Sequence, residues 1–268
     1  YGGTYRVIDD DGSIRQHDLG EPWEVIWQAG TDKFWRPVLE DDVWYDDPTL
    51  FEQIDLAGQP TGTTLELPTE AWPQGTDPGG GLLVERSGKL YSVDESSIEL
   101  IGAGDLIALS SELAVRRDCD DQLRCGLFVT DRRTGEVSRL PGDESGGPRR
   151  IEGLSNWGWG GWQSGGSVSP DGSLCAMVVI TEEYATLGLL DLRSGEVTEV
   201  GEGFWVPSVV WSPDGRLVFF LDGSDGFGSY EGGNLNAYDR RSGETFPVLS
   251  EPPDQSEPLE WVVLSARP

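Results

Sequence analysis

Carboxylates are the reactive groups that this sequence has in surplus, and five of them fall in two short polar stretches. The chain carries 48 Asp and Glu residues against 19 Lys and Arg residues, for a formal net charge of −29. Acidic loops are common ligands of calcium, which takes about six to eight oxygen atoms. The stretches 9–12 and 222–234 therefore suggest a calcium site, although the spacing matches no EF-hand loop and solvated turn residues are the alternative. The acids concerned are Asp9, Asp11, Asp222, Asp225 and Glu231.

Histidine, the most frequent general base, occurs once, as His17 in a stretch that is typical of a strand. A single histidine excludes every metal site built from several histidines and leaves one Ser-His-Asp arrangement at most. The sequence also contains no nucleophile elbow and no glycine-rich phosphate loop that opens a helix. We therefore expect the protein not to be an enzyme and to carry no cofactor other than the calcium considered above.

Two of the three cysteines flank a short polar run, which predicts a disulfide across a hairpin loop. The run 120–124 separates Cys119 from Cys125, and the two ends of a hairpin loop lie close enough to be bridged. Such a bond places the protein in an oxidising, extracytoplasmic compartment. The alternative is two unrelated thiols or an incomplete metal pair. Cys175 lies in an apolar run and is expected to be a small buried residue.

Large aromatic residues are concentrated in three glycine-rich stretches between the predicted strands. Tryptophan is favoured as an anchor at interfaces, so these rings predict a surface that binds a protein or a glycan. The alternative is that the rings fill a channel or cap the edges of sheets. Trp211, which lies inside a predicted strand, is expected to be a core residue, and Trp35 is expected to pack between blades. The candidate partner-binding residues are Trp157, Trp159, Trp162, Trp205, Phe227 and Tyr230.

The elements that position these residues are repeated, and the repeats are the strongest signal in the sequence. Ser-Pro-Asp-Gly occurs at 169–172 and again at 212–215, each time before an apolar run. A second motif, Asp-x-Arg-Ser/Thr-Gly-Glu, occurs at 131–136, 191–196 and 239–244. Proline, aspartate and glycine at these offsets favour tight turns between antiparallel strands. A period of about 40 to 50 residues with four short strands per unit is typical of propeller blades.

On these turns the sequence resembles the TolB-like, WD40-like β-propeller repeat family, whose blades carry the Ser-Pro-Asp-Gly turn. The resemblance is clear over residues 105–250 and weaker before them. It implies an all-β β-propeller of four-stranded antiparallel blades, which we expect to form one domain over residues 1–268. At about 45 residues per blade, the length of the chain predicts a six-bladed ring. It implies little about function, because propellers carry many unrelated activities.

The remaining segments complete the count of blades. Residues 80–101 predict three strands, residues 35–67 predict another blade, and residues 4–27 predict three strands of a blade that lacks its fourth. The C-terminal strand 259–265 has no other partner, so we expect it to pair with the N-terminal blade and close the ring.

Antiparallel order predicts that the two ends of each blade differ. The turns between first and second strands and between third and fourth strands share one end, where the repeated tight turns lie. The long connections, at 119–125, 141–166, 201–207 and 222–234, share the other end. Long loops with large aromatic residues are where binding sites are commonly built.

The charge and the absence of a long apolar segment narrow the range of partners. A net charge of −29 disfavours nucleic acid and anionic membranes, and no apolar run approaches the roughly 18 residues of a membrane helix. Because the chain starts at Tyr1, we expect either that a leader has been removed or that a longer precursor exists. We expect a non-catalytic extracytoplasmic module that binds a protein or glycan through its aromatic and acidic loops. The alternatives are a calcium-dependent hydrolase or lactonase with carboxylates at the channel mouth, and a spacer in a cell-envelope assembly.

Overall fold

The computed structural model describes the chain over a series of segments that contain 23 β-strands and no helix. The described residues form two compact units, one up to Gly102 and one from Ala103 onward, and each is considered by itself. The described segments are 4–8, 14–18, 25–28, 31–38, 50–122, 124–141, 150–151, 166–180, 185–203, 209–222 and 234–249.

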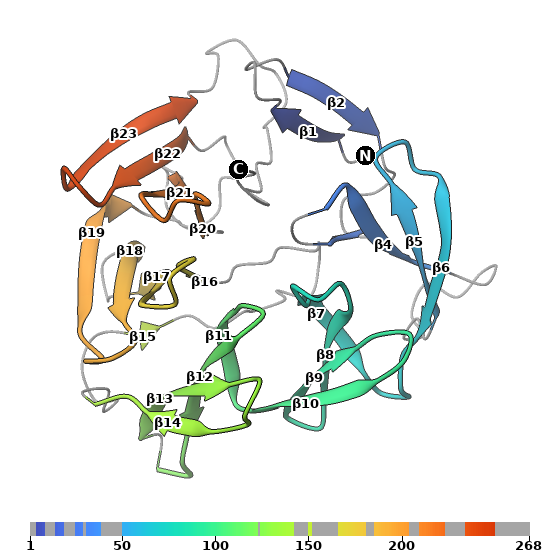
Figure 1. Cartoon of the computed structure of the whole chain (residues 1–268), viewed down its shortest axis with the longest axis horizontal. Coiled ribbons are helices and arrows are strands. Elements are labelled where there is room, and N and C mark those ends of the chain that lie inside the picture. Colours follow the sequence, from blue (N-terminus) through green and yellow to red (C-terminus); the bar gives the residue numbers. More distant parts are fainter. Residues whose placement is uncertain are drawn as a thin grey trace. The chain divides into compact units, whose positions relative to one another are not determined.

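The first unit contains one two-stranded sheet and two four-stranded antiparallel sheets (Figure 1). The two-stranded sheet pairs β1 (Thr4–Ile8) with β2 (Ile14–Asp18), which places His17 opposite Tyr5. The next sheet comprises β3 (Ile26–Trp27), β4 (Lys33–Pro37), β5 (Leu50–Asp55) and β6 (Pro60–Glu66). The third comprises β7 (Trp72–Thr76), β8 (Leu82–Arg86), β9 (Lys89–Val93) and β10 (Ile98–Ala103).

The second unit contains three antiparallel sheets, two of which have their strands in sequence order, while the middle one has an extra short strand (Figure 1). The first has β11 (Asp105–Leu109), β12 (Leu113–Cys119), β13 (Cys125–Asp131) and β14 (Val137–Arg139). The second has β16 (Ser167–Val168), β17 (Leu174–Ile180), β18 (Ala185–Asp191) and β19 (Val197–Gly203), with the short β15 (Arg150–Ile151) also paired to β17. The third has β20 (Val209–Trp211), β21 (Leu217–Asp222), β22 (Asn234–Asp239) and β23 (Glu244–Leu249).

Two sequence-based assignments of strands were wrong, and one strand was missed. The segment 4–27 does not give three strands of one blade, because β3 pairs with β4 through Ile26 opposite Trp35. A hydrogen bond of 2.9 Å from the Gln28 amide to the Lys33 carbonyl closes this hairpin. Strand β7 was not predicted, since Pro73 and Gly75 interrupt its apolar alternation. The predicted connection 141–166 contains β15, which pairs with the C-terminal residues Val179 and Ile180 of β17.

The core lies between neighbouring sheets, because alternate residues of each strand face opposite sides. In the second unit, Ile107, Val115 and Leu127 of one sheet form a buried cluster with Cys175 and Met177 of the next. A second cluster joins β17 and β18 to β20 and β21, and a third joins the two four-stranded sheets of the first unit. The predicted burial of Cys175 is confirmed, and burial raises the pKa of its thiol to about 12.

Two tryptophans tie neighbouring sheets together by the same kind of contact. The indole N–H of Trp211 donates to the Ser167 carbonyl of the preceding sheet at 2.7 Å. In the first unit, the indole N–H of Trp35 donates to the Gly80 carbonyl at 3.2 Å. Both rings are nearly inaccessible, as predicted, with exposed fractions of 5% and 3%.

The Ser-Pro-Asp-Gly turns repeat one hydrogen-bond pattern almost atom for atom. The Ser169 hydroxyl donates to Asp171 at 2.6 Å and accepts from the Leu174 amide at 2.9 Å. In the second copy, Ser212 contacts Asp214 at 2.6 Å and the Leu217 amide at 2.8 Å. Hydrogen bonds from Ser169 and Ser173 hold the pKa of Asp171 at about 2. This bonding explains why the motif recurs before the second strands β17 and β21.

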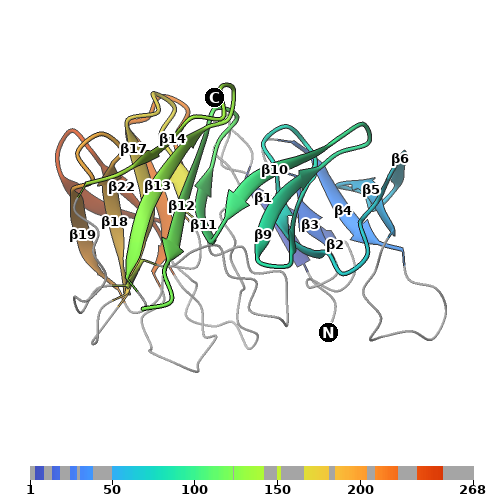
Figure 2. The ribbon, with the colours of Figure 1, turned by 90° about the horizontal axis from the view of Figure 1, so that it is seen from below.

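In the second unit, the two kinds of tight turn lie at one end of each sheet, as predicted. Amide–carbonyl hydrogen bonds link them within each sheet: Arg132 to Glu112 at 2.8 Å, Leu192 to Ser173 at 3.0 Å, and Arg240 to Arg216 at 3.1 Å. The tight turns of neighbouring sheets also lie against each other. A Cβ added at Gly215 would be 3.4 Å from Cδ of Pro170. We call this end of the second unit the tight-turn end and the opposite end the hairpin end; Figure 2 shows the strands running between them.

Candidate functional site

The hairpin end of the second unit carries a disulfide-closed hairpin between β12 and β13. The antiparallel pairing runs without a break from Leu113 opposite Asp131 to Cys119 opposite Cys125. The predicted Cys119–Cys125 disulfide is confirmed. Its two sulfurs have different surroundings, because Cys119 is exposed whereas Cys125 is only 3% exposed.

The loop of this hairpin is also held by Asp120. Its carboxylate accepts hydrogen bonds from the amides of Gln122 at 2.9 Å and Arg124 at 3.0 Å, and pairs with the Arg124 guanidinium at 2.6 Å. The Arg124 side chain, followed by these amides, lowers the pKa of Asp120. The loop geometry is therefore specified by polar contacts as well as by the disulfide.

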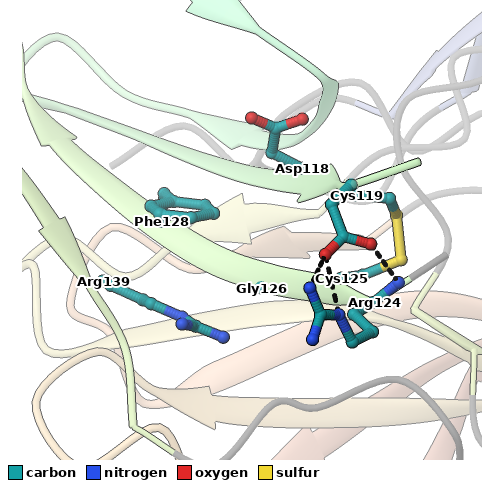
Figure 3. Close-up of a pocket in the computed structure, with 8 residues that line it drawn as sticks. Asp118, Cys119, Arg124, Cys125, Gly126, Phe128 and Arg139 are labelled. Carbon is teal, nitrogen blue, oxygen red and sulfur yellow. Dashed lines mark hydrogen bonds and ion pairs between the residues drawn. A yellow bond between two sulfur atoms is a disulfide. The ribbon is translucent and has the colours of Figure 1, made fainter. Parts of the chain in front are cut away.

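A pocket of about 510 Å³ opens beside the hairpin (Figure 3). Gly126 forms part of its wall because it has no side chain: a Cβ there would lie 3.0 Å from Arg139 Nε and 3.2 Å from Phe128 Cε2. The pocket thus combines an aromatic ring and a disulfide with groups of both charges. Its lining residues are Asp118, Cys119, Asp120, Arg124, Cys125, Gly126, Phe128 and Arg139.

Cross-strand register places Asp118, Phe128 and Arg139 of this lining on the same face of the sheet. Asp118 lies opposite Gly126, and Phe128 lies opposite Arg139, so all four residues share one face of the sheet. The exposed Asp118 and Arg139 make no ion pair in the part of the chain that the structure describes. Exposed charges beside an aromatic wall are suited to contact a polar partner.

Two consecutive arginines of β12, one on each face of the sheet, lie next to residues that line the pocket. Arg116 is 7% exposed, donates to the Ala103 carbonyl, and lies 3.3 Å from the Thr130 hydroxyl. Burial lowers the pKa of Arg116, and nearby Asp118 acts in the opposite direction. On the other face, Arg117 Nη2 lies 3.1 Å from Cys125 Sγ. The buried sulfur of the disulfide therefore has a guanidinium beside it.

Most of the sequence-predicted site residues lie outside the described residues. The tryptophans of the 141–166 connection, together with Trp205, Phe227 and Tyr230, are among them, as are four of the five acids. The backbone of Asp222 ends β21, opposite Asn234, but its side chain is not described. Among the described residues, no three His, Cys, Asp or Glu side chains gather as a metal site would require. The calcium site and the hydrolase alternative stay predictions.

The pocket residues other than the cysteines were not predicted from the sequence. Phe128 and Arg139 belong to ordinary strand patterns, and only the register of β12, β13 and β14 brings them to the hairpin. Two turns of the first unit were also missed, although both carry a signal. The Asp77 carboxylate accepts a hydrogen bond from the Gly79 amide at 2.6 Å, and the Asp55 carboxylate accepts one from the Ala57 amide at 2.8 Å. Both turns are degenerate copies of the repeated turns.

Comparison with solved structures shows the fold. A protein of Agrobacterium tumefaciens described as TolB aligns with a TM-score of 0.60 and 14% identity, over 88% of this chain and 84% of its own. TolB of Acinetobacter baumannii aligns with a TM-score of 0.52 and 14% identity, over 86% and 54%. The propeller domain of the Trilobed protease of Pyrococcus furiosus aligns with a TM-score of 0.54 and 12% identity, over 92% and 77%.

The chain is therefore an all-β propeller, structurally similar to TolB-like propellers, and the residues that the structure describes contain five blades of four-stranded antiparallel sheets. The sequence matches no protein-family model. It also matches no curated protein. No helix among the described residues is long and apolar enough to cross a membrane. At sequence identities of 12–14%, the similarity to these structures concerns the fold and does not extend to function.

Proposed function

We propose that the protein is a non-catalytic, extracytoplasmic propeller module that binds a protein or glycan partner at its hairpin end. The observation that carries the proposal is the contrast between the two ends of the blade β11–β14. At the tight-turn end, backbone groups are bonded to one another, as between Arg132 and Glu112. At the hairpin end, a fixed loop presents a pocket with an aromatic wall and exposed charges.

Rigidity at the hairpin end supports binding rather than simple solvent exposure. A surface that is already ordered loses less conformational entropy on association, so more of its contact energy appears as affinity. The Asp120 contacts and the disulfide supply this order at the loop. The adjacent Phe128 and Arg139 belong to residue types that are enriched at interfaces.

The predicted aromatic residues extend this surface in our proposal. The connection with Trp157, Trp159 and Trp162 follows β14, whose last residue, Arg139, lines the pocket. Trp205, Phe227 and Tyr230 belong to connections at the corresponding end of the next two blades. We further propose that β1 and β2 belong to a sixth blade, to which the C-terminal segment 259–265 contributes a strand.

The proposed compartment follows from the disulfide. Disulfides persist where the surroundings are oxidising and are rare in the cytosol of most organisms. A secreted or envelope-associated location is therefore part of the proposal, and the strongly negative charge argues against nucleic acid as the partner.

Site-specific photo-cross-linking tests the proposal. A benzophenone amino acid is placed either at Asp121, at the exposed tip of the hairpin, or at Ser194, in an exposed turn of the tight-turn end. We expect discrete adducts from position 121 after irradiation in extracts of the source cells, and none from position 194. Adducts from position 194 with none from position 121 would refute the assignment of the binding end.

A further inference from the structure

We propose that Cys119 is a site of thiol–disulfide exchange, at which an external thiol forms a mixed disulfide while Cys125 leaves as a thiolate. The proposal does not rest on partner binding. It rests on the different surroundings of the two sulfurs in one bond, and on contacts that hold the hairpin when the bond is open.

The two cysteines differ first in how accessible they are to an external thiol. Cys119 is exposed at the end of β12, whereas Cys125 is 3% exposed at the start of β13. Thiol–disulfide exchange proceeds by attack of a thiolate on one sulfur, and the accessible sulfur is the one that is attacked. An incoming thiol therefore reaches Cys119 Sγ before Cys125 Sγ.

The charges near the two sulfurs also favour Cys119 as the attacked sulfur and Cys125 as the leaving group. Arg117 Nη2 lies 3.1 Å from Cys125 Sγ, and its carboxylate neighbour Asp105 is 3.8 Å away and largely exposed. A guanidinium beside a sulfur favours the thiolate and makes that sulfur the better leaving group. Cys119, in contrast, follows the exposed Asp118, whose negative charge disfavours a thiolate there.

The chemical step is balanced with a thiol as the reductant. A thiolate RS⁻ attacks Cys119 Sγ, the bond between Cys119 Sγ and Cys125 Sγ breaks, and Cys125 keeps the electron pair as a thiolate. The product is a mixed disulfide, R–S–S, on Cys119. A second thiolate then attacks the reagent's sulfur in the mixed disulfide, which releases the oxidised reagent as a disulfide and Cys119 as a thiolate that takes a proton from water.

Opening the bond leaves the hairpin with other constraints. The ladder between β12 and β13 is continuous, and Asp120 still bonds two loop amides and the Arg124 guanidinium. The exchange therefore changes the chemistry of the pocket wall, where both cysteines lie, without requiring the blade to unfold.

The test uses the intact chain, with 2-mercaptoethanol and dithiothreitol as the thiols. After brief treatment, acid quenching and peptide mapping, we expect the 2-mercaptoethanol adduct on Cys119. Cys175 serves as an internal control, since its burial and its raised pKa keep it unmodified in the folded protein. Adduct formation predominantly on Cys125 would overturn the proposal.

The role of Arg117 is tested by R117Q, with R133Q as the matched control because Arg133 is exposed in the 131–136 turn at the tight-turn end, away from the disulfide. We expect R117Q to slow reduction by dithiothreitol by about three- to tenfold and R133Q to leave it within about twofold. Equal rates for R117Q and the wild type would contradict the proposal. If R117Q does not fold, R117K retains the charge and is expected to stay close to the wild-type rate, and a tenfold slower rate for it would also contradict the proposal.

A second measurement reports on the thiolate directly. In C119S, the thiolate absorbance of Cys125 gives its pKa, which we expect below the ordinary value of about 8.5 and higher by at least about one unit in C119S with R117Q. A merely structural role for Arg117 would leave this pKa unchanged, and that result would refute the assignment.

Discussion

Replacing Gly195 with alanine is expected to destabilise the protein far more than the same change in the two sibling turns. Gly195 has a φ of +74°, and a Cβ there would lie 1.9 Å from the Pro141 carbonyl oxygen, which is backbone. Gly135 and Gly243 have φ values of +73° in the equivalent turns, with nothing within 4 Å of the added Cβ. The three sites therefore share the conformational penalty and differ in the steric one.

The expected sizes follow from these two terms. A left-handed φ costs an L-residue about 1–2 kcal/mol, so G135A and G243A should lose about that much free energy of unfolding. Forcing the Pro141 backbone away should cost G195A a further 1–3 kcal/mol or so. Urea denaturation of the three variants, with the disulfide intact, measures the difference. Equal losses at all three positions would show that the third-to-fourth-strand turn of β18–β19 does not press against the end of the preceding blade.

Truncating Trp211 is expected to have an effect of similar size, because the ring joins two blades. Its indole N–H donates to the Ser167 carbonyl, it packs in the cluster between β17–β18 and β20–β21, and the Arg240 guanidinium carbon lies 5.4 Å from the ring centroid. W211A should lose about 3–5 kcal/mol of unfolding free energy, the usual range for a buried aromatic residue.

A graded control separates the hydrogen bond from the packing. W211F keeps most of the apolar contact and leaves the Ser167 carbonyl without its donor, so it should lose about 1–3 kcal/mol. Both variants are compared with the wild type by chemical denaturation. A loss below about 1 kcal/mol for W211A would mean that the two blades are not held together by this residue.

The sequence predicted the blades of residues 105–250 well because their turns are chemically explicit. Serine, aspartate and glycine occur there at the offsets at which the structure uses their hydroxyl, carboxylate and left-handed conformation. The N-terminal half was harder, since β7 contains Pro73 and Gly75 and its turn is the degenerate Asp77-Pro78-Gly79-Gly80. In such a blade, hydrogen-bonded pairing with the neighbouring strand, rather than the β-propensity of the residues, determines which residues form the strand.

The candidate site was predictable only in part, for a reason of register. The spacing of Cys119 and Cys125 sufficed for the disulfide, because a bridge across a hairpin loop depends on local geometry. The meeting of Gly126, Phe128 and Arg139 depends on how three strands are paired, and a shift of one residue would turn each side chain to the other face.

The affinity of the captured partner for two matched double variants tests most directly whether the hairpin end is the binding end. W157A with W159A removes two of the predicted anchors, and R193A with E196A changes two exposed residues of the tight-turn end while conserving net charge. We expect the first to weaken binding at least about 30-fold, as loss of an interface hot spot does, and the second to leave it within about twofold. The reverse pattern, with binding lost only when the tight turns are changed, would contradict the account.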